Sequence, residues 1–328
     1  MAVVVTGAAG FIGRHVVHRI CRRGVAVVGI DRRTWTPMAG EVAIVADVAE
    51  PDPVVDRMLR GATGVVHLAA CAGVRDDRPD VAMRRRRDNV VAGARVLEVT
   101  PPSTMVVVAS SSSVYGGAGP VDRPRPCRED DRVAPRGGYA RSKWALERRA
   151  MRRAAGGGAV GVVRPFTVVG PGQRPDMAVS RWIAALQAGR ELIRYGSGDR
   201  RRDITDVSDV AEGIVRMLDG RVTTTVNLGT GVTHRLDDVV ALVAQCCGVE
   251  PTVRVAAVHA DDVATTLADV DRGRRLLGLT PRSDLPAMID RQVRAAAMSL
   301  VDHDPAPRVA VEFVSAGGIP RPSTPHRR

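Results

Sequence analysis

The hydrophobic positions of this chain fall into short apolar runs that alternate with amphipathic stretches. Six runs rich in β-branched residues lie at about 2–6, 25–30, 42–46, 64–69, 105–110 and 159–164, and segments of helical periodicity separate them. Short, almost uniformly apolar strands are typical of a parallel sheet that helices cover on both faces. The pattern therefore predicts an α/β protein with a doubly wound parallel sheet.

A glycine-rich turn follows the first of these strands. Gly7, Gly10 and Gly13 stand between the strand at 2–6 and a helix that is predicted to run to about Arg23. Glycine lets the backbone turn tightly and approach a phosphate closely, and a helix N-terminus attracts phosphate. The order of strand, glycines and helix therefore predicts the dinucleotide site of a Rossmann fold.

An acidic residue ends the second strand. Asp31 comes eighteen residues after Gly13, where a carboxylate can accept hydrogen bonds from both ribose hydroxyls of an adenosine and repel a 2′-phosphate. This position predicts NAD as the cofactor. Arg32 and Arg33 follow directly and leave NADP open as the alternative, because arginine binds phosphate well.

Small and polar residues also follow other predicted strands. Ligands of doubly wound proteins bind at the carboxyl ends of the strands. We therefore expect one edge of the sheet to gather the segments 7–13, Asp31, Asp47-Val48, His67-Leu68-Ala69-Ala70 and Ser110-Ser111-Ser112-Ser113.

The only lysine of the chain stands four residues after a tyrosine. Of the 48 lysines and arginines, all except Lys143 are arginine. Positions four apart share a helix face, so we expect the Lys143 ammonium beside the phenol of Tyr139, where it would lower the pKa of the phenol. The pair predicts a general base; the alternative is an accidental surface lysine.

The composition is that of an ordinary soluble globular protein. The 328 residues are 45% hydrophobic, enough for one large domain or two coupled ones. No apolar run reaches the roughly 18 residues of a membrane span, and no basic leader precedes the first strand. We therefore expect a cytoplasmic protein without a membrane partner. The spacing of the five cysteines fits no metal site, so reduced thiols and no metal are expected.

The chain has a formal net charge of +12, which raises the question of nucleic-acid binding. The longest basic run, 84–87, consists of four arginines inside a helical stretch, and the nine aromatic residues are scattered. Stacking platforms for bases are therefore missing. We interpret the run as a solvated helix face and expect no nucleic-acid partner; the alternative is that some arginines bind an anionic substrate such as a diphosphate.

Eight segments together resemble the extended short-chain dehydrogenase/reductase superfamily, in particular its nucleotide-sugar 4-epimerases. They span about residues 2–290. Two further segments, Ala72-Gly73-Val74-Arg75 and 173–178, are similar to the branch that acts on UDP-glucuronate and UDP-glucose. The eight segments begin at Thr6 (6–13), His67 (67–70), Asn89 (89–93), Ser110 (110–116), Tyr139 (139–143), Arg164 (164–171), Arg202 (202–207) and Asn227 (227–231).

The resemblance implies a catalytic role for three residues. Tyr139 would be the base, Lys143 would hold the nicotinamide ribose and lower the pKa of Tyr139, and Ser111 would share the proton of the sugar 4-hydroxyl. The implied cofactor-binding residues are Gly7, Gly10, Phe11, Ile12, Gly13, Asp31, Arg32, Asp47, Val48, Leu68, Ala69, Ala70, Asn89, Tyr139, Lys143 and Phe166.

The resemblance also implies a UDP-sugar site. Tyr195 would pack on uracil and Arg202 would bind the diphosphate, while Ser112, Ser113 and Arg75 would meet the carboxylate of a glucuronate. The alternative for Arg75 is a cofactor phosphate or a loop cap, and Tyr115 is equally open to a core position. The implied substrate-binding residues are Arg75, Ser111, Ser112, Ser113, Thr167, Ala178, Tyr195, Arg202, His259 and Asp262.

Three positions in two segments depart from the family pattern. Ser113 stands where the 4,6-dehydratases and decarboxylases of the superfamily have a glutamate, and this favours epimerisation because proton chemistry after the oxidation would lack its acid or base. His259 stands where an arginine is expected and Asp261 where a glycine is expected; a protonated His259 or Arg254 is the candidate to compensate.

The expected reaction is NAD-dependent inversion at C4, from UDP-glucuronate to UDP-galacturonate or from UDP-glucose to UDP-galactose, through a 4-keto sugar. A reductase, dehydratase or decarboxylase on the same fold, or a non-catalytic NAD-sensing protein, remains as the alternative. We expect a cofactor domain at 1–170 with a return segment near 221–231, a smaller C-terminal substrate lobe at 171–220 and 232–300, and a disordered Pro/Arg-rich tail at 302–328. Helices near 78–100 and 139–155 would form a homodimer, as in relatives.

Overall fold

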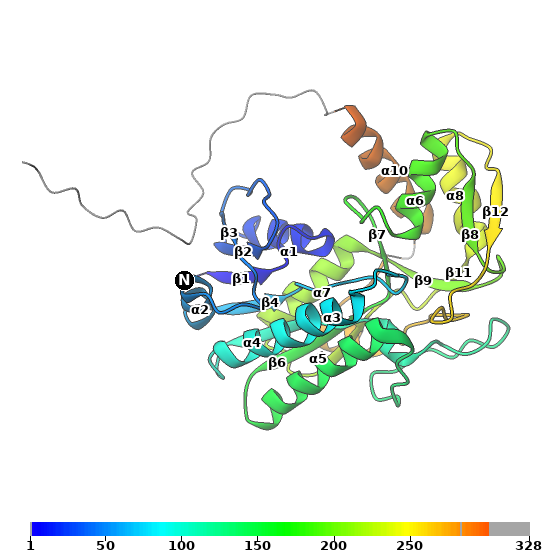
Figure 1. The fold of residues 1–328 in the computed structure, drawn as a ribbon. Coiled ribbons are helices and arrows are strands. Elements are labelled where there is room, and N and C mark those ends of the chain that lie inside the picture. The colour runs from blue at the N-terminus through cyan, green and yellow to red at the C-terminus, as the bar shows by residue number, and fades with distance from the viewer. Residues whose placement is uncertain (1, 283, 302–328) are drawn as a thin grey trace, which may run out of the picture.

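The computed structural model describes residues 2–282 and 284–301, and its centre is a seven-stranded parallel sheet (Figure 1). The strand order is β10-β6-β5-β4-β1-β2-β3, so the chain winds outward in both directions from β1. The predicted fold is confirmed, whereas the expected disordered tail lies outside the described residues. The strands are β1 (Val3–Thr6), β2 (Val27–Asp31), β3 (Glu41–Val45), β4 (Gly64–His67), β5 (Met105–Ala109), β6 (Val160–Pro165) and β10 (Thr225–Leu228).

Helices cover both faces of this sheet, which explains why its inner strands are mainly apolar (Figure 1). Helices α1 (Phe11–Cys21), α7 (Val207–Asp219) and α9 (Asp271–Leu277) bury their apolar residues on one face. Helices α2 (Pro53–Arg60), α4 (Ala92–Val99) and α5 (Gly137–Ala155) do so on the other. No helix in the part of the chain that the structure describes is both long and apolar enough to cross a membrane.

The helix in front of α4 changes its winding. α3 (Val81–Arg85) continues into the π-helical turn η1 (Arg86–Val91), which leads directly into α4. A π-turn inserts one residue into an α-helix and is often found at functional sites. Here the turn contains Asn89, which is fully buried.

A smaller lobe lies at the carboxyl side of the sheet and has a core of its own (Figure 1). It contains α6 (Ala178–Gln187), α8 (Leu236–Cys247) and α10 (Leu285–Val301), a two-stranded sheet of β8 (Leu192–Tyr195) and β12 (Val253–Ala256), and a three-stranded sheet of β7 (Thr167–Val169), β9 (Arg201–Asp206) and β11 (Thr233–Arg235). Helix α7 falls within the range 171–220 that the sequence assigned to this lobe. The structure instead packs α7 against α1 and the central sheet, because its apolar face is continuous with theirs.

A buried ion pair joins β6 to α5. Arg164 donates to Glu147 from Nε (3.0 Å) and from Nη2 (2.7 Å), and the two side chains are 2% and 0% exposed. Arg164 also donates to the hydroxyl of Tyr115 (2.8 Å), which in turn bonds Asn227 Oδ1 (2.7 Å). Tyr115 is therefore a core residue, which decides the question that the sequence left open.

Candidate active site

The glycine turn after β1 forms a cradle that side chains would fill. Gly7 has a φ of +72°, and a Cβ built on it would lie 2.7 Å from the backbone nitrogen of Ala69. A Cβ on Gly13 would lie 2.1 Å from the carbonyl oxygen of Gly7. Helix α1 starts after Gly10 with no side-chain cap on its N–H groups. These free donors and the open backbone fit the pyrophosphate of a dinucleotide.

Asp31 ends β2 beside this cradle and is 9% exposed. Its carboxylate accepts hydrogen bonds from the backbone N–H groups of Ala9 (3.2 Å) and Arg33 (3.0 Å), which fixes it toward the glycine turn. Arg32 is paired with Asp88 (2.9 Å) and Arg33 with Asp31 itself (3.4 Å). Both cations are engaged by carboxylates, which favours NAD over a cofactor with a 2′-phosphate.

Replacing Asp31 by alanine is expected to weaken NAD binding by about tenfold or more, because a hydrogen bond to a charged group contributes at least about 1.5 kcal/mol. The variant should also discriminate less against NADP. Isothermal titration of both cofactors measures this, with Asp219→Ala, which removes a surface carboxylate paired with Arg23, as the control. Unchanged affinity for NAD would contradict the assignment.

Three polar residues meet at the carboxyl end of β5. Ser111 follows the strand and caps η2 (Ser112–Tyr115) by accepting from the Ser113 N–H (3.2 Å). The phenol of Tyr139, in the first turn of α5, shares a hydrogen bond with Ser111. Lys143 lies one turn further along α5 and donates from Nζ to the carbonyl oxygen of Ala109 (2.8 Å). The predicted helix that carries both Tyr139 and Lys143 is therefore present, and Ser111 faces it.

Burial and two arginines act in opposite directions on the pKa of Tyr139. Burial raises the pKa of the phenol, while Ser111, Arg174 and Arg85 lower it. Burial lowers the pKa of Lys143 to about 8, against the opposing effect of Glu147. That Lys143 lowers the phenol's pKa stays a prediction: its Nζ donates to the carbonyl oxygen of Ala109, and the leading cations that lower the phenol's pKa are Arg174 and Arg85.

The sequence missed both arginines. Arg174 precedes α6 and pairs with Asp176 (2.9 Å from Nε to Oδ1). Arg85 belongs to the basic run that was interpreted as a solvated face. Its neighbours Arg84 and Arg86 are exposed, but Arg85 is buried. The sequence did contain a pattern that indicates this position. Arg85 lies four residues before Asn89, and positions four apart share a helix face.

The predicted substrate residues of the smaller lobe come together around Asp262. Arg75 forms an ion pair with Asp262, and its guanidinium carbon lies 4.2 Å from the centre of the Tyr195 ring. Arg202 lies 4.0 Å from Asp262, and burial lowers its pKa to about 10. His259 Nε2 is 3.7 Å from an oxygen of Asp77. Cations, an aromatic ring and a carboxylate thus share one corner, the composition that a nucleoside diphosphate requires.

One of the two candidates to compensate for His259 lies elsewhere. Arg254, on β12, is exposed and pairs with Glu191 (2.5 Å) at the edge of its sheet. Arg254 is therefore not part of this corner. Arg200 and Arg75 both lower the pKa of Arg202. Several cations are therefore already close to one another in this corner.

The serine run carries unsatisfied hydroxyls. Among the described residues, the Oγ atoms of Ser110 and Ser113 are buried without a hydrogen-bond partner. Leaving a buried polar group unpaired costs about 1–3 kcal/mol, so a ligand group fits this place. Thr167, partly buried, begins β7, and Ala178, exposed, begins α6.

Three predicted cofactor residues do not offer their side chains to the site. Val48, Asn89 and Phe166 are 5%, 0% and 3% exposed. The amide of Asn89 accepts from the Cys71 N–H (2.7 Å) and donates to Ser142 Oγ (2.8 Å), and Phe166 packs near Tyr115. Their side chains pack beneath the site and support the backbone around it. Asp47, after β3, is held by Arg87 (2.8 Å).

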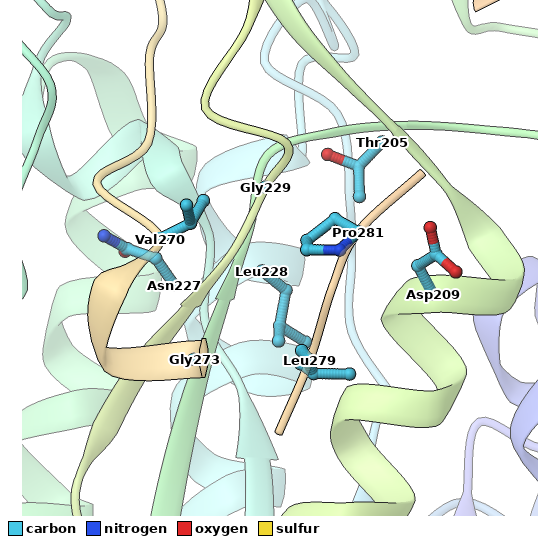
Figure 2. A pocket seen from close by; sticks show the side chains of 9 residues that line it. All are labelled: Thr205, Asp209, Asn227, Leu228, Gly229, Val270, Gly273, Leu279 and Pro281. Carbon is cyan, nitrogen blue, oxygen red and sulfur yellow. The ribbon is translucent and has the colours of Figure 1, made fainter. Parts of the chain in front are cut away.

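A separate pocket lies between β10, α7 and α9, away from these residues (Figure 2). Asp209 on its wall accepts from the backbone N–H of Arg282 (2.8 Å). The lining includes none of the serine, tyrosine and lysine residues at the end of β5. It consists of Thr205, Asp209, Asn227, Leu228, Gly229, Val270, Gly273, Leu279 and Pro281.

A glycine cradle, a carboxylate beside it at the end of β2 and a Ser–Tyr–Lys set on a parallel sheet together define a nicotinamide-dependent enzyme of the extended short-chain dehydrogenase/reductase type. The family described as "NAD dependent epimerase/dehydratase family" matches residues 3–229, and the chain belongs to it. The expected family, cofactor and enzyme class are confirmed.

Similar proteins and structures point the same way. The chain is 29% identical over 311 residues to the uncharacterized UDP-glucose epimerase YtcB of Bacillus subtilis (87% of this chain, 94% of that protein). It is 28% identical over 312 residues to the UDP-glucuronate 4-epimerase of Thermodesulfobacterium geofontis (88% and 94%). Among solved structures, MoeE5 in complex with UDP-glucuronic acid and NAD is 37% identical, with 91% of this chain and all of that chain covered and a TM-score of 0.83.

Proposed function

We propose that the protein inverts C4 of UDP-glucuronate to give UDP-galacturonate, with NAD retained and UDP-glucose as a second substrate. NAD-dependent C4 epimerisation agrees with the relatives named UDP-glucuronate 4-epimerase. The choice of sugar rests on one observation: two cations, Arg174 and Arg85, lower the pKa of the Tyr139 phenol. An anionic sugar that reacts at Tyr139 would meet them.

The chain's own residues fit the steps of this reaction. When bound, NAD supplies the reversible acceptance of hydride from the sugar. Tyr139 accepts the proton of the 4-hydroxyl, Ser111 shares that proton, and Lys143 holds the ribose of the cofactor. The corner of Tyr195 and Arg202 keeps hold of the UDP moiety while the oxidised sugar turns. Tyr139 then returns the proton to the 4-oxygen, and C4 is inverted because it would take the hydride back on its opposite face. Holding the reacting groups in place contributes several kcal/mol to the rate.

The carboxylate is better assigned to Arg174 than to Arg75. Arg75 is bound to Asp262 and stacked over Tyr195, the residue proposed to pack on uracil, and this supports a place for Arg75 at the uracil end of the site. Arg174 lowers the pKa of the phenol by its charge, and the unpartnered hydroxyl of Ser113 can donate a hydrogen bond. Because position 113 carries no carboxylate, a dehydratase or decarboxylase has no acid or base there.

Incubating the protein with each UDP-sugar and following products by NMR tests the proposal. UDP-galacturonate should form from UDP-glucuronate without added cofactor. Arg174→Met should lower the ratio of kcat/KM for UDP-glucuronate over UDP-glucose by about tenfold or more, since a charge-assisted bond of about 1.5–3 kcal/mol is lost.

Arg75→Met is the matched control, because it should affect both sugars alike through the shared UDP moiety. A UDP-pentose as the main product would overturn the epimerase proposal. Turnover of UDP-glucose alone would overturn the choice of sugar.

We also propose that the protein is a cytoplasmic homodimer and that the smaller lobe binds the UDP-sugar. The support for a dimer is apolar side chains on the outer helices: Met83, Val91 and Met151 are 69%, 44% and 45% exposed. They lie on α3, η1 and α5, the helices that the sequence selected for the contact. Apolar surface of this kind is typical of an interface.

A further inference from the structure

Arg85, the last residue of α3, is a buried cation without a counter-ion. It is 7% exposed, and its Nη2 donates to the carbonyl oxygens of Gly73 (2.8 Å) and Val74 (3.4 Å). Its Nε is buried with no partner among the described residues, and no carboxylate of that part of the chain lies within ion-pair distance of it. A buried charge is costly unless it is compensated, so an anion is missing from its surroundings.

One carboxylate that Arg85 influences is already paired with another cation. Arg85 lowers the pKa of Asp76, but the carboxylate of Asp76 is bound by Arg78 through Nε (2.8 Å) and Nη2 (2.5 Å). Arg85 therefore keeps its charge available to other groups.

The guanidinium of Arg85 lies against the start of α5. A Cβ built on Gly138 would come within 2.9 Å of Arg85 Nη1, so the absence of a side chain at the residue before Tyr139 leaves room for it. Once Tyr139 ionises, its phenolate is a negative charge that the guanidinium of Arg85 can stabilise.

The other groups around the Tyr139 phenol are neutral, paired with a carboxylate or bound to a backbone carbonyl. Ser111, after β5, contributes a hydrogen bond, and Cys71, after β4, opposes ionisation. Arg174 shares its charge with Asp176. Lys143, on the same helix as Tyr139, is bound to Ala109 and influenced by Glu147. Of the cations that lead in lowering the phenol's pKa, Arg174 and Arg85, only Arg85 has no carboxylate within ion-pair distance among the described residues.

We propose that Arg85 is a positioning residue whose buried charge stabilises the phenolate of Tyr139 and holds the backbone at 73–74 in place beside it. This rests on the proposed function, in which Tyr139 is the base. A cation favours the charged form of a phenol, so removing it must raise the pKa of Tyr139. The rise in pKa moves the activity that depends on the phenolate to higher pH.

Arg85→Gln and Arg85→Lys in the full chain separate charge from hydrogen bonding. Glutamine keeps an N–H donor for Gly73 but loses the charge, whereas lysine keeps the charge. The phenolate of Tyr139 is titrated by ultraviolet difference spectroscopy against the Tyr139→Phe protein, and the acid limb of kcat is measured in parallel. Arg84→Gln, which changes an exposed neighbour paired with Asp80, is the matched control.

The glutamine variant should raise the midpoint of both curves by on the order of one pH unit, about a tenfold loss of kcat below the limb. The lysine variant and the Arg84 control should stay near wild type. An unchanged titration in Arg85→Gln, or an equal shift in Arg85→Lys, would overturn the proposal.

If the glutamine variant does not fold, Gly138→Ala displaces Arg85 without removing its charge and should shift the titration in the same direction. No shift there would count against the role. A wild-type protein that converts no UDP-sugar would overturn the proposed function. The titration of Tyr139 does not depend on turnover and tests the role of Arg85 by itself.

Discussion

Replacing Tyr139 by phenylalanine is expected to abolish turnover and to leave NAD and UDP-sugar bound. The substitution removes only the phenol oxygen, which Ser111 contacts, and keeps the ring in its place at the start of α5. General-base catalysis contributes about 10²–10⁴-fold to a rate, so kcat should fall by roughly that factor. Product formation by NMR gives kcat, and calorimetry gives the two affinities.

The chain contains its own control for this experiment. Tyr115→Phe removes another tyrosine hydroxyl, one that is buried and bonded to Asn227 and Arg164. That variant should lose stability and keep kcat. An active Tyr139→Phe protein would remove this residue from the mechanism, and an inactive but folded Tyr115→Phe protein would show that the assay does not separate chemistry from packing.

Replacing Arg164 by methionine is expected to lower the free energy of unfolding by about 3–5 kcal/mol, because it leaves the Glu147 carboxylate buried without its cation. The ion pair is almost entirely removed from solvent, so water cannot compensate the carboxylate. Urea denaturation followed by circular dichroism measures the loss.

Two further variants separate this effect from general damage. The double variant Arg164→Met/Glu147→Leu should recover most of the stability, since replacing both partners by apolar residues is often neutral. Arg23→Met, which breaks an exposed pair with Asp219, should cost less than about 1 kcal/mol. A double variant no more stable than Arg164→Met would show that the pair itself is not the cause.

The fold was predictable because the information is local. Apolar runs, glycine turns and an acid at the end of the second strand are each readable within a few residues, and the parallel sheet follows from their alternation. The Tyr139–Lys143 spacing also predicts a shared helix face without any tertiary information. The structure agrees with each of these elements.

What the sequence could not provide depends on packing between distant segments. Burial separates Arg85 from Arg84 and Arg86, although the three are chemically identical neighbours in the run. The bond from Lys143 to Ala109 joins residues 34 positions apart, and it decides where the ammonium points. The placement of α7 on the central sheet depends likewise on which apolar face lies opposite.

The burial of Lys143 makes this side chain a probe for spectroscopy and chemical modification of the protein in solution. Because the chain has one lysine, isotope labelling of lysine places a single ε-amino signal in the spectrum, and it comes from the centre of the site. The side chain is 3% exposed and bound to a carbonyl, so we expect proton exchange from that amine to be slower than from an exposed lysine. Amine-directed acylation of the folded protein would in turn have one side-chain target and would report directly on the opening of α5 from β5.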